Sequence, residues 1–269
     1  MIKLKQNLIS LEIEGDVMAY ISLLFLTLFF APAEAAPNDG ILIHTYEEDV
    51  TGDGEAELLE LKGKLFAEDG VYYQDIWVDI SSPSSDKTWR INYGGGYDPE
   101  LQFADLTHNG VTDILYQSPT GGSGGLYTSQ LNQWEEENFI ELPLPIEQPV
   151  KGEFMDGFKV SVQLLPKEPP IILDVSGQKE EYIRLKLYND QGKLLEPTTL
   201  MIDPVAFFEI IDLEDKNQAG LKSYQQISGA YHADQIGTVE SIWFYDKDKW
   251  ILLKTALQTD LLHIEDSAG

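Results

Sequence analysis

Short runs that alternate apolar and polar residues, separated by turn residues, constrain the fold of this chain more than any other feature. The segment 160–164 reads Val-Ser-Val-Gln-Leu, and the segment 182–188 reads Tyr-Ile-Arg-Leu-Lys-Leu-Tyr. Successive side chains of a strand point to opposite faces, so this alternation is typical of half-buried strands. We therefore predict an all-β protein.

The predicted strands fall in two groups along the chain. Those of the amino-terminal part are 40–45, 56–65, 71–80, 89–93, 113–117 and 125–130. Those of the carboxyl-terminal part are 159–165, 182–188, 199–202, 205–212, 221–227, 237–245 and 250–255. Helix signals are scarce: residues 135–140 and 230–236 each have room for a turn of helix.

A cluster of prolines in the middle of the chain favours extended, loop-rich structure there, because proline donates no backbone hydrogen bond. The prolines are Pro143, Pro145, Pro149, Pro166, Pro169 and Pro170. We interpret this cluster as a seam between residues 36–142 and residues 143–269, with both parts packed in one domain.

Two acidic segments of equal length share one register. They are Asp49–Leu58, which reads DVTGDGEAEL, and Asp105–Ile114, which reads DLTHNGVTDI. Both place oxygen-bearing side chains at positions 1, 3, 5 and 9, glycine at position 6 and an apolar residue at position 10. A single segment of this kind is as readily a plain acidic turn, but two copies in register favour a cation site.

Calcium binds through six to eight oxygen atoms, and a short loop can supply them when alternate side chains point inward. Glycine at position 6 permits the sharp turn that such a loop needs. Position 7 contributes only a backbone carbonyl, so its side chain is free to differ, as Glu55 and Val111 do. The second segment has fewer charged oxygen donors than the first, so we expect it to bind calcium more weakly.

The second segment follows Phe103-Ala104 and continues through a predicted strand to Ser118-Pro119. This arrangement resembles the FG-GAP/VCBS repeats of integrin-type β-propellers, whose loop reads F-x-D-x-[ND]-x-[DN]-G-x-x-D before a strand that ends in a small residue and proline. The resemblance implies a propeller-like or partial propeller fold of antiparallel blades with calcium-binding hairpin loops. It also implies two sets of calcium ligands. The first set is Asp49, Thr51, Asp53, Glu55 (carbonyl) and Glu57, and the second is Asp105, Thr107, Asn109, Val111 (carbonyl) and Asp113.

A third, degenerate copy is expected at residues 212–221, where Lys216 stands at position 5 and would repel a cation. The three copies begin at residues 49, 105 and 212, so the second interval, 107 residues, is close to twice the first, 56 residues. An unmarked copy is therefore expected near Glu153–Phe158. A period of about 40–60 residues is that of a propeller blade.

Composition narrows the classes of partner. The 269 residues carry a formal net charge of −28, so phosphate backbones and anionic membrane surfaces are repelled and nucleic-acid binding is excluded. The chain has no cysteine, which excludes disulfides, thiolate metal sites and a cysteine nucleophile. Its four histidines are scattered and form no HxH or HxxxH pair, which argues against a zinc or copper site.

The amino terminus resembles a secretory signal peptide. Lys3 and Lys5 precede the apolar run 17–31, and the small-residue pattern Ala33-Glu34-Ala35 follows it. The run is short for a membrane span, so we expect residues 1–35 to be cleaved, with no span left in the mature chain. The acidic residues just before the run are atypical and leave an uncleaved anchor as an alternative. We expect a secreted or cell-envelope protein.

Other motifs have weaker chemical meaning. Residues 121–125 read Gly-Gly-Ser-Gly-Gly, which matches the G-x-S-x-G nucleophile pattern, but a strand follows where the pattern requires a helix. Adjacent acids such as Glu180 and Glu181 are more typical of solvated faces than of a glycosidase pair. The tryptophans are more typical of a β core than of a carbohydrate platform. We assign no mechanism to residues 224–234, which include His232 and Asp234.

From the sequence we therefore expect a non-enzymatic, calcium-binding module with a protein or glycan ligand. A secreted hydrolase, or an accessory subunit of one, is the main alternative, and a convergent group of acids in a deep pocket would favour it. A self-associating coat protein is a further alternative.

Overall fold

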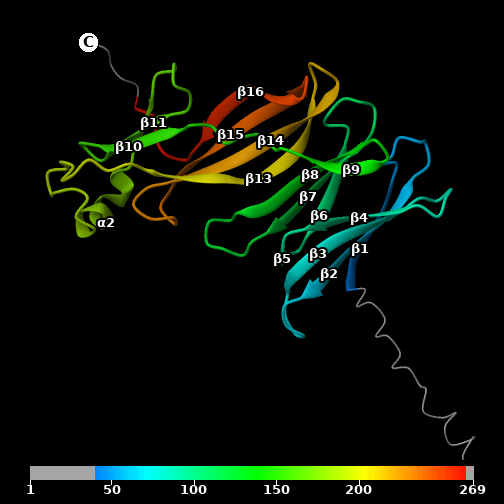
Figure 1. The fold of residues 1–269 in the computed structure, drawn as a ribbon. Helices are drawn as coiled ribbons and strands as arrows, with labels where there is room; N and C mark the ends of the chain where they lie inside the picture. Colours follow the sequence, from blue (N-terminus) through cyan, green and yellow to red (C-terminus); the bar gives the residue numbers. More distant parts are fainter. Residues whose placement is uncertain (1–39, 265–269) are drawn as a thin grey trace, which may run out of the picture. The chain divides into compact units, whose positions relative to one another are not determined.

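The computed structural model describes residues 40–264, and contacts group these residues into one unit. Their strands form antiparallel sheets (Figure 1), which confirms the all-β prediction. No sheet of this described range closes on itself. The predicted signal peptide, residues 1–35, lies outside the described residues.

Four sheets follow one another in chain order. The first sheet contains β1 (Ile41–Glu48), β2 (Glu57–Leu65), β3 (Tyr72–Ser81), β4 (Thr88–Tyr93) and the short β5 (Gly96–Tyr97). The second contains β6 (Glu100–Ala104), β7 (Asp113–Pro119), β8 (Tyr127–Glu135) and β9 (Asn138–Leu142). The third contains β10 (Lys151–Met155), β11 (Lys159–Gln163) and β12 (Ile171–Asp174). The fourth contains β13 (Met201–Leu213), β14 (Gln218–Ser228), β15 (Gln235–Asp246) and β16 (Lys249–Gln258).

The first sheet has one apolar and one polar face. Leu59 and Leu61 of β2 are fully buried, whereas Lys62 points to the other face and pairs with Asp79 of β3 at 3.1 Å. Arg90 of β4 pairs with the same Asp79 carboxylate. The alternation along each strand therefore directs the apolar side chains toward the second sheet and the charged ones toward solvent.

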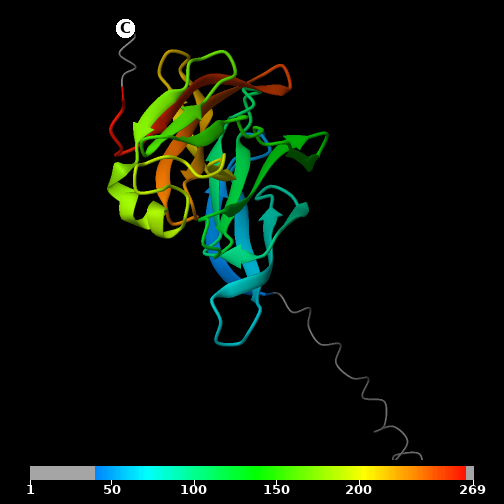
Figure 2. The same ribbon diagram turned by 90° about the vertical axis from the view of Figure 1, so that its left-hand side faces the viewer.

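The second sheet lies between the first and the fourth. Ile114 and Tyr116 of β7 belong to the core shared with the first sheet, and Leu115 belongs to the core shared with Phe208 and other residues of the fourth. Both faces of β7 are therefore buried. Figures 1 and 2 agree: the blue to cyan strands of the first sheet and the orange to red strands of the fourth lie on opposite sides of the green second sheet.

A side-chain amide joins the second sheet to the edge of the fourth. The Gln117 Nε2 atom donates to the carbonyl of Phe208 at 2.8 Å, and the Phe208 backbone N–H donates to Gln117 Oε1 at 2.7 Å. Gln117 is buried, and its amide satisfies backbone groups of β13 that have no neighbouring strand on that side. The backbone N–H and carbonyl of Phe208 are thereby paired at this edge of the fourth sheet.

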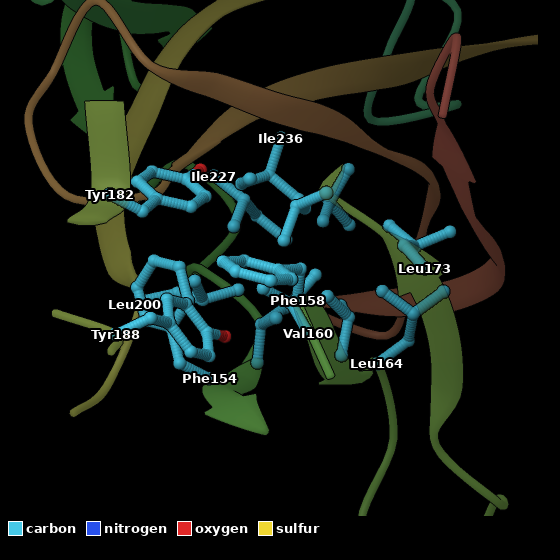
Figure 3. Packing of buried hydrophobic residues seen from close by; sticks show 14 residues of the cluster. Phe154, Phe158, Val160, Leu164, Leu173, Tyr182, Tyr188, Leu200, Ile227 and Ile236 are labelled. Carbon is cyan, nitrogen blue, oxygen red and sulfur yellow. The ribbon is translucent and has the colours of Figure 1, made fainter. Parts of the chain in front are cut away.

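The third sheet and one end of the fourth share a separate core (Figure 3). In Figure 3, Phe154 and Val160 of the third sheet lie near Ile227 of the fourth, with Tyr182 and Tyr188 beside them. Phe154 meets Tyr182 edge to face, with ring centroids 5.4 Å apart. This core therefore depends on residues from β10 to β15 and on the segment between β12 and β13.

The strand predicted at residues 182–188 is wrong. Residues Ser176–Gln178 form the 3-10 helix η1, and Lys179–Arg184 form the short helix α2. Tyr182 is completely buried and donates to Asp234 Oδ2 at 2.7 Å, while Leu185 is 41% exposed. Burial of Tyr182 against a partner far along the chain thus outweighs the local alternation.

Two further local predictions differ from the structure. Residues 135–140 contain a tight hairpin turn between β8 and β9, and residues 230–236 contain turns that lead into β15; neither range is helical. The strands predicted at 199–202 and 205–212 lie in one strand, β13, which passes through Pro204. β13 is an edge strand with bulges around Pro204, where proline is tolerated because no ladder hydrogen bond is needed from it.

The first hairpin of each sheet recurs at a regular interval. The connections that close these hairpins begin at Asp49, Asp105, Asp156 and Glu214. Residues 153–158, where an unmarked copy is expected, contain the turn between β10 and β11, and residues 212–221, where a degenerate copy is expected, contain the turn between β13 and β14. Residues 40–264 thus contain four successive antiparallel meanders, three of four main strands and one of three.

Candidate functional site

The first loop, residues 49–57, connects β1 to β2 and is closed by its own side chains. Asp49 accepts hydrogen bonds from the backbone N–H groups of Gly52 at 2.7 Å and Gly54 at 3.0 Å. Asp53 accepts one from the N–H of Glu55 at 2.9 Å. Glu57 accepts bonds from the N–H of Val50 at 3.0 Å and from the hydroxyl of Thr51 at 3.1 Å, and its Oε2 also accepts the N–H of Thr51. Carboxylates thus hold both ends of the loop.

The second loop, residues 105–113, connects β6 to β7 and repeats this pattern. Asp105 accepts bonds from the N–H groups of Asn109 at 3.1 Å and Gly110 at 3.0 Å. The Asn109 side chain accepts the N–H of Val111 at 2.8 Å. Asp113 accepts the N–H groups of Leu106 and Thr107, both at 2.9 Å, and the Thr107 hydroxyl at 3.3 Å. The two segments that share a register in the sequence therefore share most of their internal hydrogen bonds, namely those of the side chains at positions 5 and 9 and the bond from position 6 to position 1.

The glycines at position 6 adopt backbone conformations that suit glycine. Gly54 has φ = 92° and Gly110 has φ = 88°, and a Cβ atom at either position would meet nothing within 4 Å. The requirement for glycine there is therefore conformational rather than steric. Position 4 is also left-handed, with φ = 74° at Gly52 and φ = 60° at His108.

The carboxylates at position 9 are buried. Glu57 has no exposed surface and Asp113 is 1% exposed. Burial is the main cause that raises the pKa of the Asp113 carboxyl from 3.8 to about 6; repulsion by Asp105 adds to the increase, and the bonds from Leu106 and Thr107 oppose it. Burial likewise raises the pKa of Glu57, with added repulsion from Asp53. Within residues 40–264, neither carboxylate forms an ion pair, so each loop carries negative charge that only neutral donors stabilise.

The two loops are in contact. A Cβ atom built on Gly52 would lie 2.7 Å from Cγ2 of Val111, so the glycine at this position lets the first loop approach the second. The predicted ligands of both segments therefore lie in adjacent loops. The turn at 214–217 differs: backbone N–H groups of Lys216 and Asn217 donate to the Leu213 carbonyl, and no side-chain oxygen of this described turn accepts a backbone bond.

The donor set of both loops suits a hard cation such as calcium, because it consists of carboxylate, hydroxyl, amide and carbonyl oxygens. Asp53 lies close enough to Glu57, and Asp105 to Asp113, for repulsion between the carboxylates to affect the pKa. Across the described range, however, no three acidic or histidine side chains converge as a ready metal-ligating group. A cation in either loop would therefore depend on neutral oxygens as well as on the carboxylates. A convergent group of acids is also the feature that would favour a hydrolase.

A hollow of about 400 Å³ opens beside the first loop, at the junction of the first and second sheets. Thr51, Asp53 and Glu57 line one side. Trp89 of β4 and Trp134 of β8 line another, with ring centroids 5.1 Å apart and planes at 86°. The remaining wall comes from the loop between β3 and β4 and from the turn between β8 and β9. The tryptophan pair follows from packing between sheets, for which the sequence carries no local signal.

The other motifs of the sequence lie apart from this site. Residues 121–125 form part of the connection between β7 and β8, where the Thr120 hydroxyl donates to the carbonyl of Leu126 at 2.8 Å. His232 Nδ1 lies 3.4 Å from Asp203, a partner that the sequence did not indicate. Asp234 accepts bonds from Tyr182 and from the N–H of Ala230, so it joins the turn before β15 to α2.

Comparison with known proteins gives two matches. Residues 148–258, which include the third and fourth sheets, match a family described as the YybI C-terminal domain. The chain is also similar to a protein of Bacillus subtilis (strain 168) called "Uncharacterized protein YybI", with 28% identity over 200 residues, which cover 72% of this chain and 76% of the relative. Neither description names a ligand or an activity.

Proposed function

We propose that this chain is an exported, calcium-binding β-repeat protein that acts as a non-enzymatic binding module at the cell envelope or outside the cell. The observation that carries the proposal is the pair of adjacent loops. In each, the carboxylate at position 1 accepts the N–H of position 6, and the loop closes over a buried carboxylate at position 9 without an ion pair. A divalent cation would offset the repulsion between the carboxylates in each loop.

The ligands proposed for calcium are those implied by the FG-GAP/VCBS resemblance. In the first loop they are Asp49, Thr51, Asp53, the carbonyl of Glu55 and Glu57. In the second they are Asp105, Thr107, Asn109, the carbonyl of Val111 and Asp113. When bound, calcium would link loop folding to the concentration of the ion outside the cell. Hydrogen bonds within each loop already hold it in a turn, and the proposed ligand oxygens all lie within that loop.

The proposed fold is a partial, propeller-like arrangement in which each antiparallel meander corresponds to a blade. Four successive meanders and the recurring first hairpin support it. The second sheet, with neighbours on both faces, is packed as a blade inside a propeller would be. The fourth sheet packs against both the second and the third sheets. We call the arrangement partial because the four sheets do not follow one another around a common axis as the blades of a closed propeller do (Figures 1 and 2).

Export is proposed from the amino-terminal segment, whose structure lies outside the described residues. Within residues 40–264 there is no helix with the length and apolar character that a membrane span needs. The proposed partner is a protein or a glycan, because the strong negative charge opposes nucleic acid. Amino-terminal sequencing of the protein from its native host would test the predicted cleavage: a mature end at Ala36 supports export with cleavage, and an intact Met1 contradicts cleavage and favours the uncleaved anchor.

Thermal unfolding of the full-length chain tests the calcium proposal. We expect millimolar calcium to raise the melting temperature by several degrees over excess EGTA, and magnesium to do so less. Asp49→Ala/Asp53→Ala should remove the part of the shift that depends on the first loop. Asp215→Ala, in the turn between β13 and β14, is the matched control and should keep the full shift. No shift in the wild-type chain, together with no bound calcium by elemental analysis, would reduce both loops to acidic turns.

A further inference from the structure

The hollow beside the first loop combines aromatic rings with hydroxyl groups. Trp89 and Trp134 meet edge to face, so their rings present apolar surface in two nearly perpendicular directions. Phe139 of β9 supports Trp134 from a centroid distance of 5.0 Å. Ser82, Ser84 and Ser85 of the loop between β3 and β4 line the same hollow. Ligand pockets of this size are typically apolar surfaces with a few placed polar groups.

The indole N–H of Trp134, which lines the hollow, differs from those of the other four tryptophans. The indole N–H groups of Trp77, Trp89, Trp243 and Trp250 donate to protein oxygens. Among the residues that the structure describes, the indole N–H of Trp134 donates to no protein atom, although Trp134 is only partly exposed. This N–H is not among the buried atoms that lack a partner, so it is open to solvent and can donate to a ligand in the hollow.

A hydrogen bond and an exposed ion pair join the walls of the hollow to one another. The indole N–H of Trp89 donates to the carbonyl of Glu137 at 3.2 Å, and the Lys87 ammonium pairs with the Glu137 carboxylate at 3.2 Å. These contacts join the first sheet to the turn between β8 and β9. The hollow is therefore formed before a ligand arrives.

The charges around the hollow select against an anion. Asp53, Glu57 and Glu137 line it, and Lys87, which is paired with Glu137, is the cation that lines it with them. The whole chain is strongly negative as well. If the first loop holds calcium, as proposed above, the local negative charge is largely offset, and an uncharged ligand with many hydroxyl groups becomes the best match.

A second aromatic hollow lacks these features. It has a volume of about 410 Å³ and lies between the proline-rich segment 143–148 and the aromatic residues of β15 and β16. Both of its indoles already donate to protein atoms, Trp243 to the Ser223 hydroxyl and Trp250 to the carbonyl of Pro143. Prolines and aliphatic side chains form most of its other wall. It therefore serves as a control site.

We infer that the hollow between Trp134, Trp89 and the first loop binds a neutral saccharide. The apolar face of a sugar ring would lie on an indole ring, and its hydroxyl groups would meet the Trp134 N–H, the serine hydroxyls and the oxygens of the first loop. This inference rests on the proposed binding-module function and names the class of its ligand. A ligand there would contact the first and the second sheets together.

Titration of the full-length chain with charge-matched saccharides tests the inference, with tryptophan fluorescence and calorimetry as the readouts. The neutral probes are cellohexaose, maltohexaose and chitohexaose; the cationic probe is a chitosan hexamer and the anionic probe is hexagalacturonate. In millimolar calcium we expect at least one neutral probe to bind and the anionic probe not to bind. Trp134→Ala should weaken this binding by about tenfold or more, and Trp134→Phe, which keeps a ring but removes the N–H group, by less. Trp250→Ala, in the second hollow, should leave it unchanged.

Thermal unfolding of each variant shows that it is folded, and the calcium-dependent shift is recorded in parallel. A calcium shift without binding of any neutral probe overturns the saccharide inference alone. Binding that Trp134→Ala leaves intact, or a preference for the chitosan hexamer, also overturns it. Binding that depends on Trp134 but persists in EGTA and in Asp49→Ala supports a saccharide site that does not need calcium, since Asp49 does not line the hollow. Absence of the calcium-dependent thermal shift, together with such binding, contradicts the calcium proposal alone.

Discussion

The first and second loops share most of their backbone hydrogen bonds but have different surroundings. One bond differs: Asp49 accepts the N–H of position 4, Gly52, whereas Asp105 accepts that of position 5, Asn109. The first has three acidic side chains at its proposed ligand positions 1, 5 and 9, and the second has two, with Asn109 in place of Asp53. The second loop leads into β7, whose residues 113–118 are all buried between two other sheets. The two loops thus have similar local structures, but the first carries more charge and the second leads into a more tightly packed strand.

Contacts at position 4 also differ between the two loops. Gly52 of the first loop touches Val111 of the second, whereas His108 of the second loop stacks on Phe244 of the fourth sheet at a centroid distance of 4.6 Å. Lys216 lies over the same Phe244 ring at 4.1 Å. The second loop is therefore fastened to the first loop on one side and to the fourth sheet on the other. We therefore expect the free energy of unfolding to depend more on the second loop, and calcium affinity to depend more on the first.

The largest effect is expected when a position 9 carboxylate is removed. Asp113→Ala leaves two backbone N–H groups without an acceptor, and each buried unsatisfied group costs about 1–3 kcal/mol, so we expect a loss of about 4 kcal/mol in the free energy of unfolding. Glu57→Ala should cost about 2–3 kcal/mol, because its bonds from the backbone N–H groups of Val50 and Thr51 are longer, at 3.0 and 3.2 Å. Urea denaturation in EGTA measures both, with Asp53→Ala, which removes an exposed carboxylate, as the control. A loss below about 1 kcal/mol for Asp113→Ala would contradict the role assigned to this side chain.

The pH dependence of stability should also separate the two loops. Because burial raises the pKa of Asp113 from 3.8 to about 6, the folded state binds more protons than the unfolded state between these values. This carboxyl therefore stabilises the calcium-free fold less as the pH rises from about 4 to about 6, by about 3 kcal/mol in total. Urea denaturation in EGTA across this range should show a flatter profile for Asp113→Asn than for the wild type. Equal slopes in the two proteins would show that Asp113 titrates normally; Glu57→Gln gives the corresponding comparison for the first loop, whose carboxyl pKa is also raised.

An exchange of residues at position 5 should shift calcium affinity in opposite directions. Asn109→Asp gives the second loop the charge of the first, and Asp53→Asn does the reverse. Added ligand charge strengthens calcium binding, so we expect affinity to rise about tenfold at the second loop and to fall about tenfold at the first. Calorimetric titration against a competing chelator measures both constants. Affinities that do not respond to either exchange would exclude position 5 from the ligand set.

The smallest effect concerns the cation that touches Phe244. Lys216→Ala removes the ammonium over this ring, and a cation–π contact of this partly exposed kind is worth about 0.5–1 kcal/mol. We expect that loss in urea denaturation, with no change in calcium affinity at the first loop. Lys193→Ala, which removes an exposed lysine elsewhere, is the control. A loss of similar size in the control variant would show that net charge, rather than the ring contact, is responsible.

Local patterns predicted much of the fold and of the loops. Residues 57–65 and 72–81 alternate because one face is buried, and each strand pairs with the next along the chain. The loops could be predicted because glycine at position 6 and the oxygen-bearing side chains at positions 1, 5 and 9 act within a few residues of one another. Tyr182 shows the limit of such patterns: its residues alternate as a strand would, but its hydroxyl binds Asp234 and the segment is helical.

The sequence by itself therefore determined the β class and the positions and shared register of the two loops, since these depend on backbone conformation and on neighbours along the chain. Only the tertiary structure decided that Gly52 meets Val111, that β7 is buried on both faces, and that Trp134 lies beside Trp89 next to the first loop. These contacts join residues far apart in the sequence. Their physical cause is the packing of apolar sheet faces, which is non-directional and leaves no local pattern that identifies the partner.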